Sequence, residues 1–168
     1  MEQNNPLVFE VKLTAKELWK FSMYHSNKGM AGVFNVIFSL AAIFLLITRW
    51  SVISITYRVV FLICALMFTV WQPWLLYLKS ARQAKKPAIA DGMILSFSRE
   101  GIVVSQGGSG LELIWDNISR AEQTGSMIII YMDKVHAYLL PGSVEEEKKT
   151  QLMELLKEQL PPERRKRI

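Results

Sequence analysis

Two long stretches without a charged residue constrain this chain more than any other feature of its sequence. The first covers residues 29–47 and reads GMAGVFNVIFSLAAIFLLI, and the second covers residues 59–78 and reads VVFLICALMFTVWQPWLLYL. An α-helix needs about twenty residues to cross about 30 Å of hydrocarbon at about 1.5 Å per residue. The sequence therefore predicts a hairpin of two transmembrane helices, over about residues 29–48 and 58–78.

A signal peptide or a buried helical pair would also contain apolar stretches, but both fit this sequence less well. A secretory signal peptide is disfavoured because the first stretch begins near residue 29, is followed by no small-residue cleavage site and is paired with a second stretch. A buried helical pair in a soluble protein is disfavoured because two adjacent uncharged runs of this length are unusual there. We therefore interpret residues 29–78 as a transmembrane hairpin.

The orientation of the hairpin follows from the Lys and Arg residues in its flanks, because these residues accumulate on the cytoplasmic side of short loops. Four precede the first span and four follow the second, whereas the connecting loop holds two. In the same order these residues are Lys12, Lys16, Lys20 and Lys28; Lys79, Arg82, Lys85 and Lys86; and Arg49 and Arg58. We expect both termini to be cytoplasmic, with the flanking cations Lys79, Arg82, Lys85 and Lys86 contacting an anionic lipid surface.

Asn35 and Gln72 are the most polar residues within the two spans. Either amide is able to hydrogen-bond across helices or between protomers, a contact worth about 1 kcal/mol. Pro73 removes a backbone hydrogen bond and predicts a kink in the second helix. Gly29 and Gly32 permit close approach near the inner end of the first. Since the spans contain no charge that would indicate an ion path, we expect them to act as an anchor.

Residues 1–28 predict a cytoplasmic strand followed by an amphipathic helix. Residues 7–13 alternate between apolar and polar with a period of two. Thr14 and Glu17 then have the spacing of a capping box at a helix start. This helix lies either at the inner membrane surface or as an extension of the first span. Pairing of residues 7–13 with a later sheet would make the hairpin an insertion within one folded unit.

Residues 87–168 predict a small β domain. They contain an antiparallel meander of about six strands, with a turn at residues 99–101, a flexible loop at residues 107–110 and Trp115 in the core. The strands are expected at residues 93–97, 102–106, 111–116, 118–124, 127–132 and 134–140, and on the face of Trp115 we expect Leu111 and Leu113 to be buried.

A helix follows this meander. Ser143 and Glu146 have capping-box spacing, and the helix carries a stripe of Leu152, Leu155, Leu156 and Leu160. A single helix covering one end of a curved meander is the pleckstrin-homology-like (PH-like) layout. The expected fold class is an α+β membrane protein, with a two-helix transmembrane hairpin and a small antiparallel β domain with a C-terminal helix (PH-like).

The order of these elements resembles the YcxB-like family of bacterial membrane proteins. The resemblance rests on the strand, capped helix and hairpin, followed by residues 97–101 (FSREG), residues 115–118 (WDNI) and residues 139–141 (LLP) before a terminal helix. It implies a PH-like C-terminal domain and the plasma membrane of a bacterium. It carries over no catalytic residue, because no biochemical activity is associated with the family.

The sequence holds no constellation that indicates catalysis, a metal or a cofactor. Cys64 is the single cysteine and lies within the second span, so we interpret it as a small buried hydrophobe. His25 and His136 lie far apart in the sequence, and no Cys/His cluster has metal-ligand spacing. We therefore expect a protein that is not an enzyme and that needs no cofactor.

The charge distribution bears on the partners. Residues 1–86 hold ten Lys or Arg and three Asp or Glu, whereas residues 87–168 hold ten and twelve. The positive charge thus flanks the apolar stretches instead of covering the β domain, which disfavours nucleic-acid binding. The basic tail of Arg164, Arg165, Lys166 and Arg167 is either a lipid-binding segment or a solvated, disordered end.

Two functions remain open from the sequence. The first is a membrane-anchored adaptor whose β domain binds a protein or lipid at the inner face, through the turns at residues 99–101 and 107–110 or through a strand edge. The second is an accessory or immunity-type subunit of a larger membrane assembly that acts through its spans, with Asn35, Gln72 and Pro73 making the contacts. The expected partners are the anionic inner leaflet and a protein or a second copy of the chain.

Overall fold

The structure is a computed structural model that describes residues 6–125, 127–133 and 136–168. It is an α+β structure with two compact units. Met1–Leu13 and Lys86–Ile168 form the first, which we call the β unit, and Thr14–Lys85 form the second, the helical unit. Residues 1–28, expected to be one segment, are therefore divided between the units.

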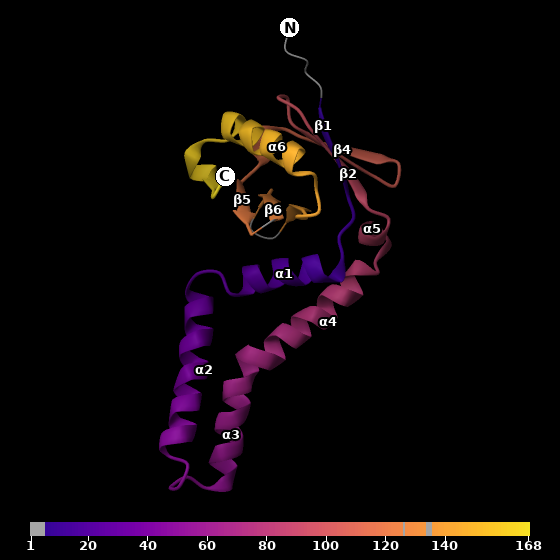
Figure 1. Ribbon diagram of the computed structural model, residues 1–168. Coiled ribbons are helices and arrows are strands. Elements are labelled where there is room, and N and C mark those ends of the chain that lie inside the picture. Colours follow the sequence, from indigo (N-terminus) through magenta and orange to yellow (C-terminus); the bar gives the residue numbers. More distant parts are fainter. Residues whose placement is uncertain (1–5, 126, 134–135) are drawn as a thin grey trace. The chain divides into compact units, whose positions relative to one another are not determined.

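The helical unit contains two helices that are long and apolar enough to cross a membrane, Met30–Thr48 and Ile55–Ala84. The first agrees with the expected span, and the second begins earlier and ends later than residues 58–78. A π-helical turn divides the second into two parts. The elements are α1 (Ala15–Ser26), α2 (Met30–Thr48), α3 (Ile55–Leu66), the π turn (Met67–Trp71) and α4 (Gln72–Ala84) (Figure 1).

Helix α1 is a separate helix and does not extend α2. It begins with the predicted capping box, in which Thr14 Oγ1 accepts the Glu17 N–H at 3.3 Å and Glu17 Oε2 accepts the Thr14 N–H at 2.7 Å. The chain turns between Asn27 and Gly29 before α2 starts. A Cβ atom at Gly32 would lie 2.1 Å from the carbonyl oxygen of Asn27, so this turn requires a glycine there.

The bend expected at Pro73 takes the form of the π turn that precedes it. Figure 1 shows α3 and α4 running in different directions on either side of this turn. Proline has no N–H to continue the α-helical pattern, and π turns inside helices accommodate such an interruption. Phe68 in the turn packs edge-on against Phe34 and Phe38 of α2, with ring centroids 6.5 and 5.6 Å apart.

The first sheet of the β unit joins a strand that precedes the helical unit to three strands that follow it. Its order is β1-β2-β3-β4, and Phe9 in β1 lies opposite Leu95 in β2. The early strand thus pairs with the later sheet, and the whole helical unit is inserted between β1 and β2. The strands are β1 (Leu7–Val11), β2 (Met93–Phe97), β3 (Ile102–Gln106) and β4 (Ser109–Leu113).

The second sheet has the order β7-β6-β5-β8. All five residues of β6 are buried, as expected for a central strand. The strand expected at residues 134–140 is present from Ala137, and residues 134 and 135 lie outside the described residues. The strands are β5 (Arg120–Thr124), β6 (Met127–Tyr131), β7 (Ala137–Leu140) and β8 (Arg165–Lys166).

The region between β3 and β5 departs from the predicted meander. Gly107 and Gly108 alone form the turn, with φ of +56° and +82°, and the rest of the expected loop belongs to β4. Positive φ at both central residues is the signature of a two-residue hairpin turn. Trp115 is buried as predicted, but it lies in a 3-10 turn (Trp115–Asn117) and not in a strand.

Leu111, predicted to be buried, is 51% exposed. It belongs to β4, the outermost strand of the first sheet on that side, which pairs only with β3 in the described part of the chain. Leu113, on the same face of the same strand, is buried as predicted, so the cover over this face reaches only the end of β4. The alternating sequence correctly predicts a strand, but alternation does not tell whether the apolar face of that strand is covered.

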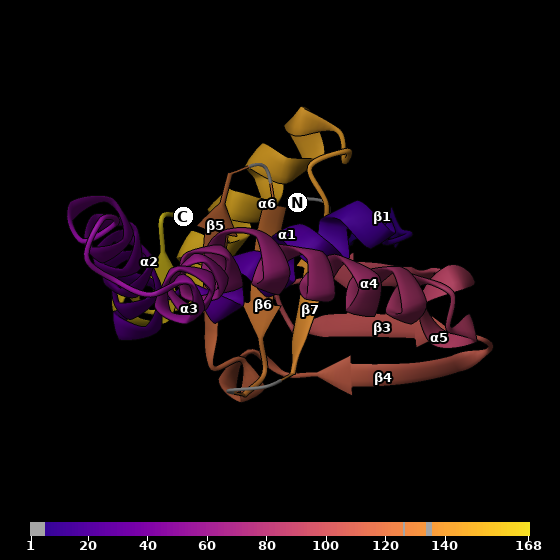
Figure 2. The same ribbon diagram turned by 90° about the horizontal axis from the view of Figure 1, so that it is seen from below.

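Helix α6 (Glu146–Gln159) closes the β unit, and the predicted capping box at its start is wrong. The N-cap is Glu145 and no side chain caps the helix, because the Val144 N–H donates to the Pro141 carbonyl and places Ser143 within a turn. Leu152 and Leu156 are fully buried and α6 contacts β1. Figure 2 shows β3 and β4 running crosswise to β6 and β7.

Candidate functional site

The structure brings together the two amides of the apolar helices. Asn35 Nδ2 in α2 donates to Gln72 Oε1 at the start of α4 at 3.4 Å, and also to Asn27 Oδ1 at 3.1 Å. All three amides belong to the helical unit and lie near the π turn. The polarity of Asn35 and Gln72 within the spans singled them out, whereas Asn27 gave no such signal because it lies before the apolar stretch.

The same region ties α1 to α4. Trp19 Nε1 donates to the carbonyl oxygen of Pro73 at 2.9 Å, and the Trp19 and Tyr77 rings meet edge-on with centroids 6.3 Å apart. Trp71 at the end of the π turn and Trp74 in α4 lie beside each other, with ring centroids 5.4 Å apart. The helical unit therefore has four aromatic side chains in this region, three tryptophans and one tyrosine. Each of these side chains has a polar part as well as an apolar part.

The basic residues after the second apolar stretch fall into both units. Lys79 and Arg82 lie in α4 and Lys85 is its C-cap, whereas Lys86 begins the β unit and is the N-cap of the short helix α5 (Pro87–Ala90). Their side chains take part in no ion pair among the described residues. Cations at or near the surface are able to meet anionic groups, so these four residues keep the role expected of them as candidates for lipid contact.

The basic tail is folded, so the alternative of a disordered end is wrong. Arg165 and Lys166 form β8, which pairs in parallel with β5. Arg165 Nη1 donates to the Lys157 carbonyl at 3.0 Å, and Arg164 Nη1 lies 3.4 Å from the carbonyls of Asp116 and Ile118. Lys166 and Arg167 remain exposed, so the tail offers two cationic side chains to solvent instead of four.

The β unit contains a hollow of about 470 Å³ at one end of the first sheet, which we call the β1–β3 hollow. Its volume lies within the range of about 300–1,000 Å³ typical of small-molecule sites. It combines charged, polar and apolar lining residues from three strands and their connections. The lining consists of Glu10, Val11, Lys12, Asp91, Gly92, Met93, Ile94, Ser105, Gln106, Gly107 and Gly108.

Strand register explains why these residues meet. Glu10 lies opposite Ile94, and Ile94 lies opposite Ser105, so the three form a row across one face of the first sheet. The tight Gly107–Gly108 turn follows β3 and lines the hollow next to this row. Lys12 follows the last residue of β1, and both Glu10 and Lys12 line the hollow.

Gln106 fixes the rim of the hollow. Its Nε2 donates to the Gly92 carbonyl at 3.3 Å and also to the Ala88 carbonyl in α5. This amide therefore links the end of β3 to the segment that leads into β2. Of the two candidate turns, residues 107–110 contribute Gly107 and Gly108 to the hollow, whereas residues 99–101 do not line it.

The turn at residues 99–101 has a structural role instead. Trp115 Nε1 donates to the carbonyls of Ser98 and Arg99 at 3.1 and 3.0 Å, and Arg99 lies 3.7 Å from Glu158 in α6. Because a buried indole needs an acceptor for its N–H, the turn satisfies Trp115 and holds the 3-10 segment in place.

A charged cluster that the sequence did not reveal lies in the second sheet. Glu122 in β5 is almost fully buried, and its Oε1 forms an ion pair with Arg120 Nε at 2.9 Å. The Arg120 guanidinium also lies 3.9 Å from the centre of the Tyr131 ring. Burial raises the pKa of the Tyr131 hydroxyl above its ordinary value of 10.0. Glu122 and Tyr131 are both buried in the second sheet, so we interpret the cluster as a structural ion pair.

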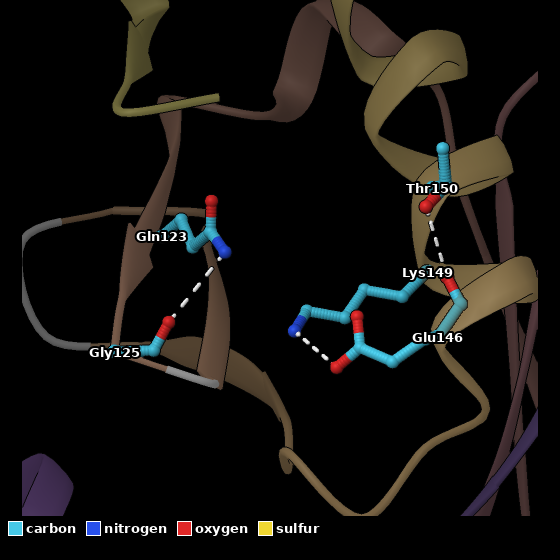
Figure 3. A network of polar contacts seen from close by, with 5 residues as sticks. All are labelled: Gln123, Gly125, Glu146, Lys149 and Thr150. Atoms are coloured by element: carbon cyan, nitrogen blue, oxygen red, sulfur yellow. Dashed lines mark hydrogen bonds and ion pairs between the residues drawn. The ribbon is translucent and has the colours of Figure 1, made fainter.

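Lys149 of α6 is a second buried charged residue of the β unit. Its Nζ lies 3.2 Å from Glu146 Oε1 one turn earlier, and the Thr150 hydroxyl donates to the Glu146 carbonyl at 2.9 Å. Figure 3 shows the Lys149 side chain extending from α6 toward the hairpin that carries Gln123 and Gly125. The aliphatic stem of Lys149 is covered while its ammonium keeps a carboxylate partner, as is usual for a buried lysine.

No group of three or more His, Cys, Asp or Glu able to hold a metal occurs in the part of the chain that the structure describes. His136 is exposed and its Nδ1 lies 2.7 Å from Asp133 Oδ2, within the turn after β6. His25 stacks on Phe21 in the helical unit. The two histidines thus belong to separate units, and the arrangement of each is local.

Comparison with known proteins places part of the chain in a family. No curated protein and no solved structure matches the chain. A family model described as YcxB-like protein matches residues 97–156, which run from the last residue of β2 into α6. The chain therefore carries a YcxB-like domain, as its order of elements indicated.

Proposed function

We propose that the chain is a two-span protein of a bacterial plasma membrane that anchors a PH-like, non-enzymatic adaptor domain at the inner face. The observation that carries the anchor is the exposure of its apolar helices. Only 11% and 6% of the most apolar windows of α2 and α3–α4 are buried within the structure. Large apolar surfaces of this kind are rare on soluble proteins and suit contact with lipid.

The length of the second helix supports a span that continues into the cytoplasm. The helix from Ile55 to Ala84 has 30 residues, about 45 Å at about 1.5 Å per residue, whereas the hydrocarbon layer is about 30 Å thick. The part that exceeds the layer carries Lys79 and Arg82. The excess of Lys and Arg outside the connecting loop supports cytoplasmic termini.

The contacts of α1 support its placement at the inner interface. Trp19 anchors α1 to the carbonyl of Pro73, next to Trp71 and Trp74 of the second helix. Trp and Tyr are enriched where headgroups meet hydrocarbon. Lys16 and Lys20 lie on the same helix, so α1 would place cations beside lipid phosphates.

The adaptor role rests on the β1–β3 hollow. Two sheets whose strands run crosswise, with one terminal helix, support the PH-like assignment of the β unit (Figure 2). The hollow is the place where this unit combines charged and apolar side chains around an open volume. A ligand at the inner face, protein or lipid, would bind there and be held near the membrane by the hairpin.

The role of an assembly subunit receives less support. Asn35 and Gln72 hydrogen-bond to each other, and Asn35 also to Asn27, inside one hairpin. Amides that already hydrogen-bond within one chain leave fewer polar groups to bond with the helix of a partner. The contacts of the hairpin therefore favour the role of an anchor over that of an assembly subunit.

Cysteine labelling tests the anchor and its orientation. In a Cys64→Ser background, Ser51→Cys in the exposed connecting loop is expected to react with a membrane-impermeant maleimide in intact cells. Glu154→Cys on the exposed side of α6 is expected to react only after permeabilisation. Labelling of both positions in intact cells, or of neither, would contradict two spans with cytoplasmic termini.

Site-specific photo-crosslinking of the full chain in cells tests the adaptor role. A benzophenone amino acid at Ser105, which lines the hollow, is expected to capture a defined protein or lipid that the same group at Glu112 does not capture. Asp91→Asn should reduce this capture. Capture only from Phe44, an exposed residue of α2, would support the assembly-subunit role instead.

A further inference from the structure

We propose that the β1–β3 hollow binds the phosphoethanolamine headgroup of a phosphatidylethanolamine lipid. This inference rests on the proposed function, because the ligand must come from the inner leaflet. It goes further by naming the chemistry of the ligand: a primary ammonium next to a phosphate diester.

The charges around the hollow call for a ligand of both signs. Glu10 and Asp91 contribute carboxylates and Lys12 contributes an ammonium, and these three side chains take part in no ion pair among the described residues. A primary ammonium donates hydrogen bonds to carboxylates, and a phosphate accepts them from an ammonium. A zwitterionic headgroup would satisfy all three, whereas a purely anionic one would face two carboxylates.

The Gly107–Gly108 turn would add backbone hydrogen-bond donors for the phosphate of the headgroup. Both residues have positive φ, and a Cβ atom at either position would meet no atom within 4 Å, so the space beside their backbone is open. Successive backbone N–H groups in a turn form concavities that bind anions. The Gln106 amide holds this turn to Gly92, so the rim is fixed before a ligand arrives.

The lining also distinguishes between headgroups. It contains no aromatic residue among those described, whereas quaternary ammonium groups are usually recognised by aromatic faces. The carboxylates favour an ammonium that donates hydrogen bonds, which selects ethanolamine over choline. Ile94, 41% exposed at the hollow, provides an apolar surface for the methylene groups of the ligand.

The connection to the helices makes a lipid the natural source. Lys12 precedes Ala15, the first residue of α1, by three positions. The segment that lines the hollow therefore continues directly into the helical unit. Under the proposed anchor, this connection keeps the β unit on the membrane that contains phosphatidylethanolamine.

Native mass spectrometry of the full-length protein in detergent tests this proposal. The probes are dioleoyl phosphatidylethanolamine, phosphatidylcholine and phosphatidylglycerol. The protein is expected to prefer phosphatidylethanolamine by about tenfold, the effect of about one charge-assisted hydrogen bond. Glu10→Gln and Asp91→Asn should each remove this preference. Glu112→Gln, a carboxylate of the same sheet face that does not line the hollow, should keep it.

Three results would overturn the proposal. They are equal binding of the three lipids, a preference that survives both hollow variants, and tight binding of soluble phosphoethanolamine by a protein that shows no preference for the lipid. Ser105→Trp, which fills the hollow from a strand position, should abolish the preference without removing a charge. If the preference is absent while crosslinking from Ser105 captures a protein, the headgroup proposal fails and the adaptor role stands.

Discussion

Leu156→Ala is expected to lower the free energy of unfolding of the β unit by about 2–5 kcal/mol, the usual cost of removing a large apolar side chain from a core. Leu156 in α6 is fully buried, and the helix contacts β1 from the other end of the sequence. Its truncation therefore leaves a cavity in a core that both chain ends help to form. Hydrogen exchange of the β6 amides in the full-length protein measures this loss, because these amides lie in the most buried strand.

Glu154→Ala is the control for this prediction. Glu154 lies on the exposed side of the same helix, so its removal is expected to change the exchange free energy by no more than about 0.5 kcal/mol. If both variants exchanged like the unmodified protein, α6 would not be part of the folded β unit.

Arg120→Met is expected to destabilise the β unit by about 3 kcal/mol. The substitution removes the guanidinium that pairs with the buried carboxylate of Glu122 and lies over the Tyr131 ring. Breaking a buried ion pair by removing one partner is costly, because the other charge keeps its desolvation penalty. The same hydrogen-exchange measurement on β6 reports the change.

The double variant Arg120→Met/Glu122→Met gives this prediction its sharpest test. Removing both charges leaves no carboxylate behind, so the double variant is expected to be more stable than Arg120→Met alone. Lys148→Met, an exposed lysine paired with exposed Glu145, serves as the control and should change stability little. A double variant less stable than the single one would show that Glu122 is stabilised mainly by contacts other than Arg120.

Local patterns predicted the elements that depend on neighbouring residues alone. The two apolar stretches, the Thr14 capping box and the strands with clear alternation were found because their signals lie within one helix or strand. The capping box at Ser143 failed because a turn from Pro141 competes for the same residues. The helix therefore starts after Glu145, and spacing alone does not show which of two local structures prevails.

The candidate site was only partly visible in the sequence. Gly107 and Gly108 were recognised as a loop, but nothing local links them to Glu10 or Asp91, which lie almost a hundred and about sixteen residues away along the chain. The register of β1, β2 and β3 brings them together. Likewise, Arg120 and Glu122 share a strand face by spacing, but Tyr131 joins them only through the pairing of β5 with β6.

Two helices long and apolar enough for a membrane, and a YcxB-like domain after them, were predictable without the fold, because composition and short-range periodicity carry both signals. Three features became visible only in the folded chain: β1 completes the later sheet, the basic tail pairs with β5 as a strand, and a charged hollow opens at one end of the first sheet. These features depend on hydrogen bonds and packing between residues far apart in the chain, which no local pattern encodes.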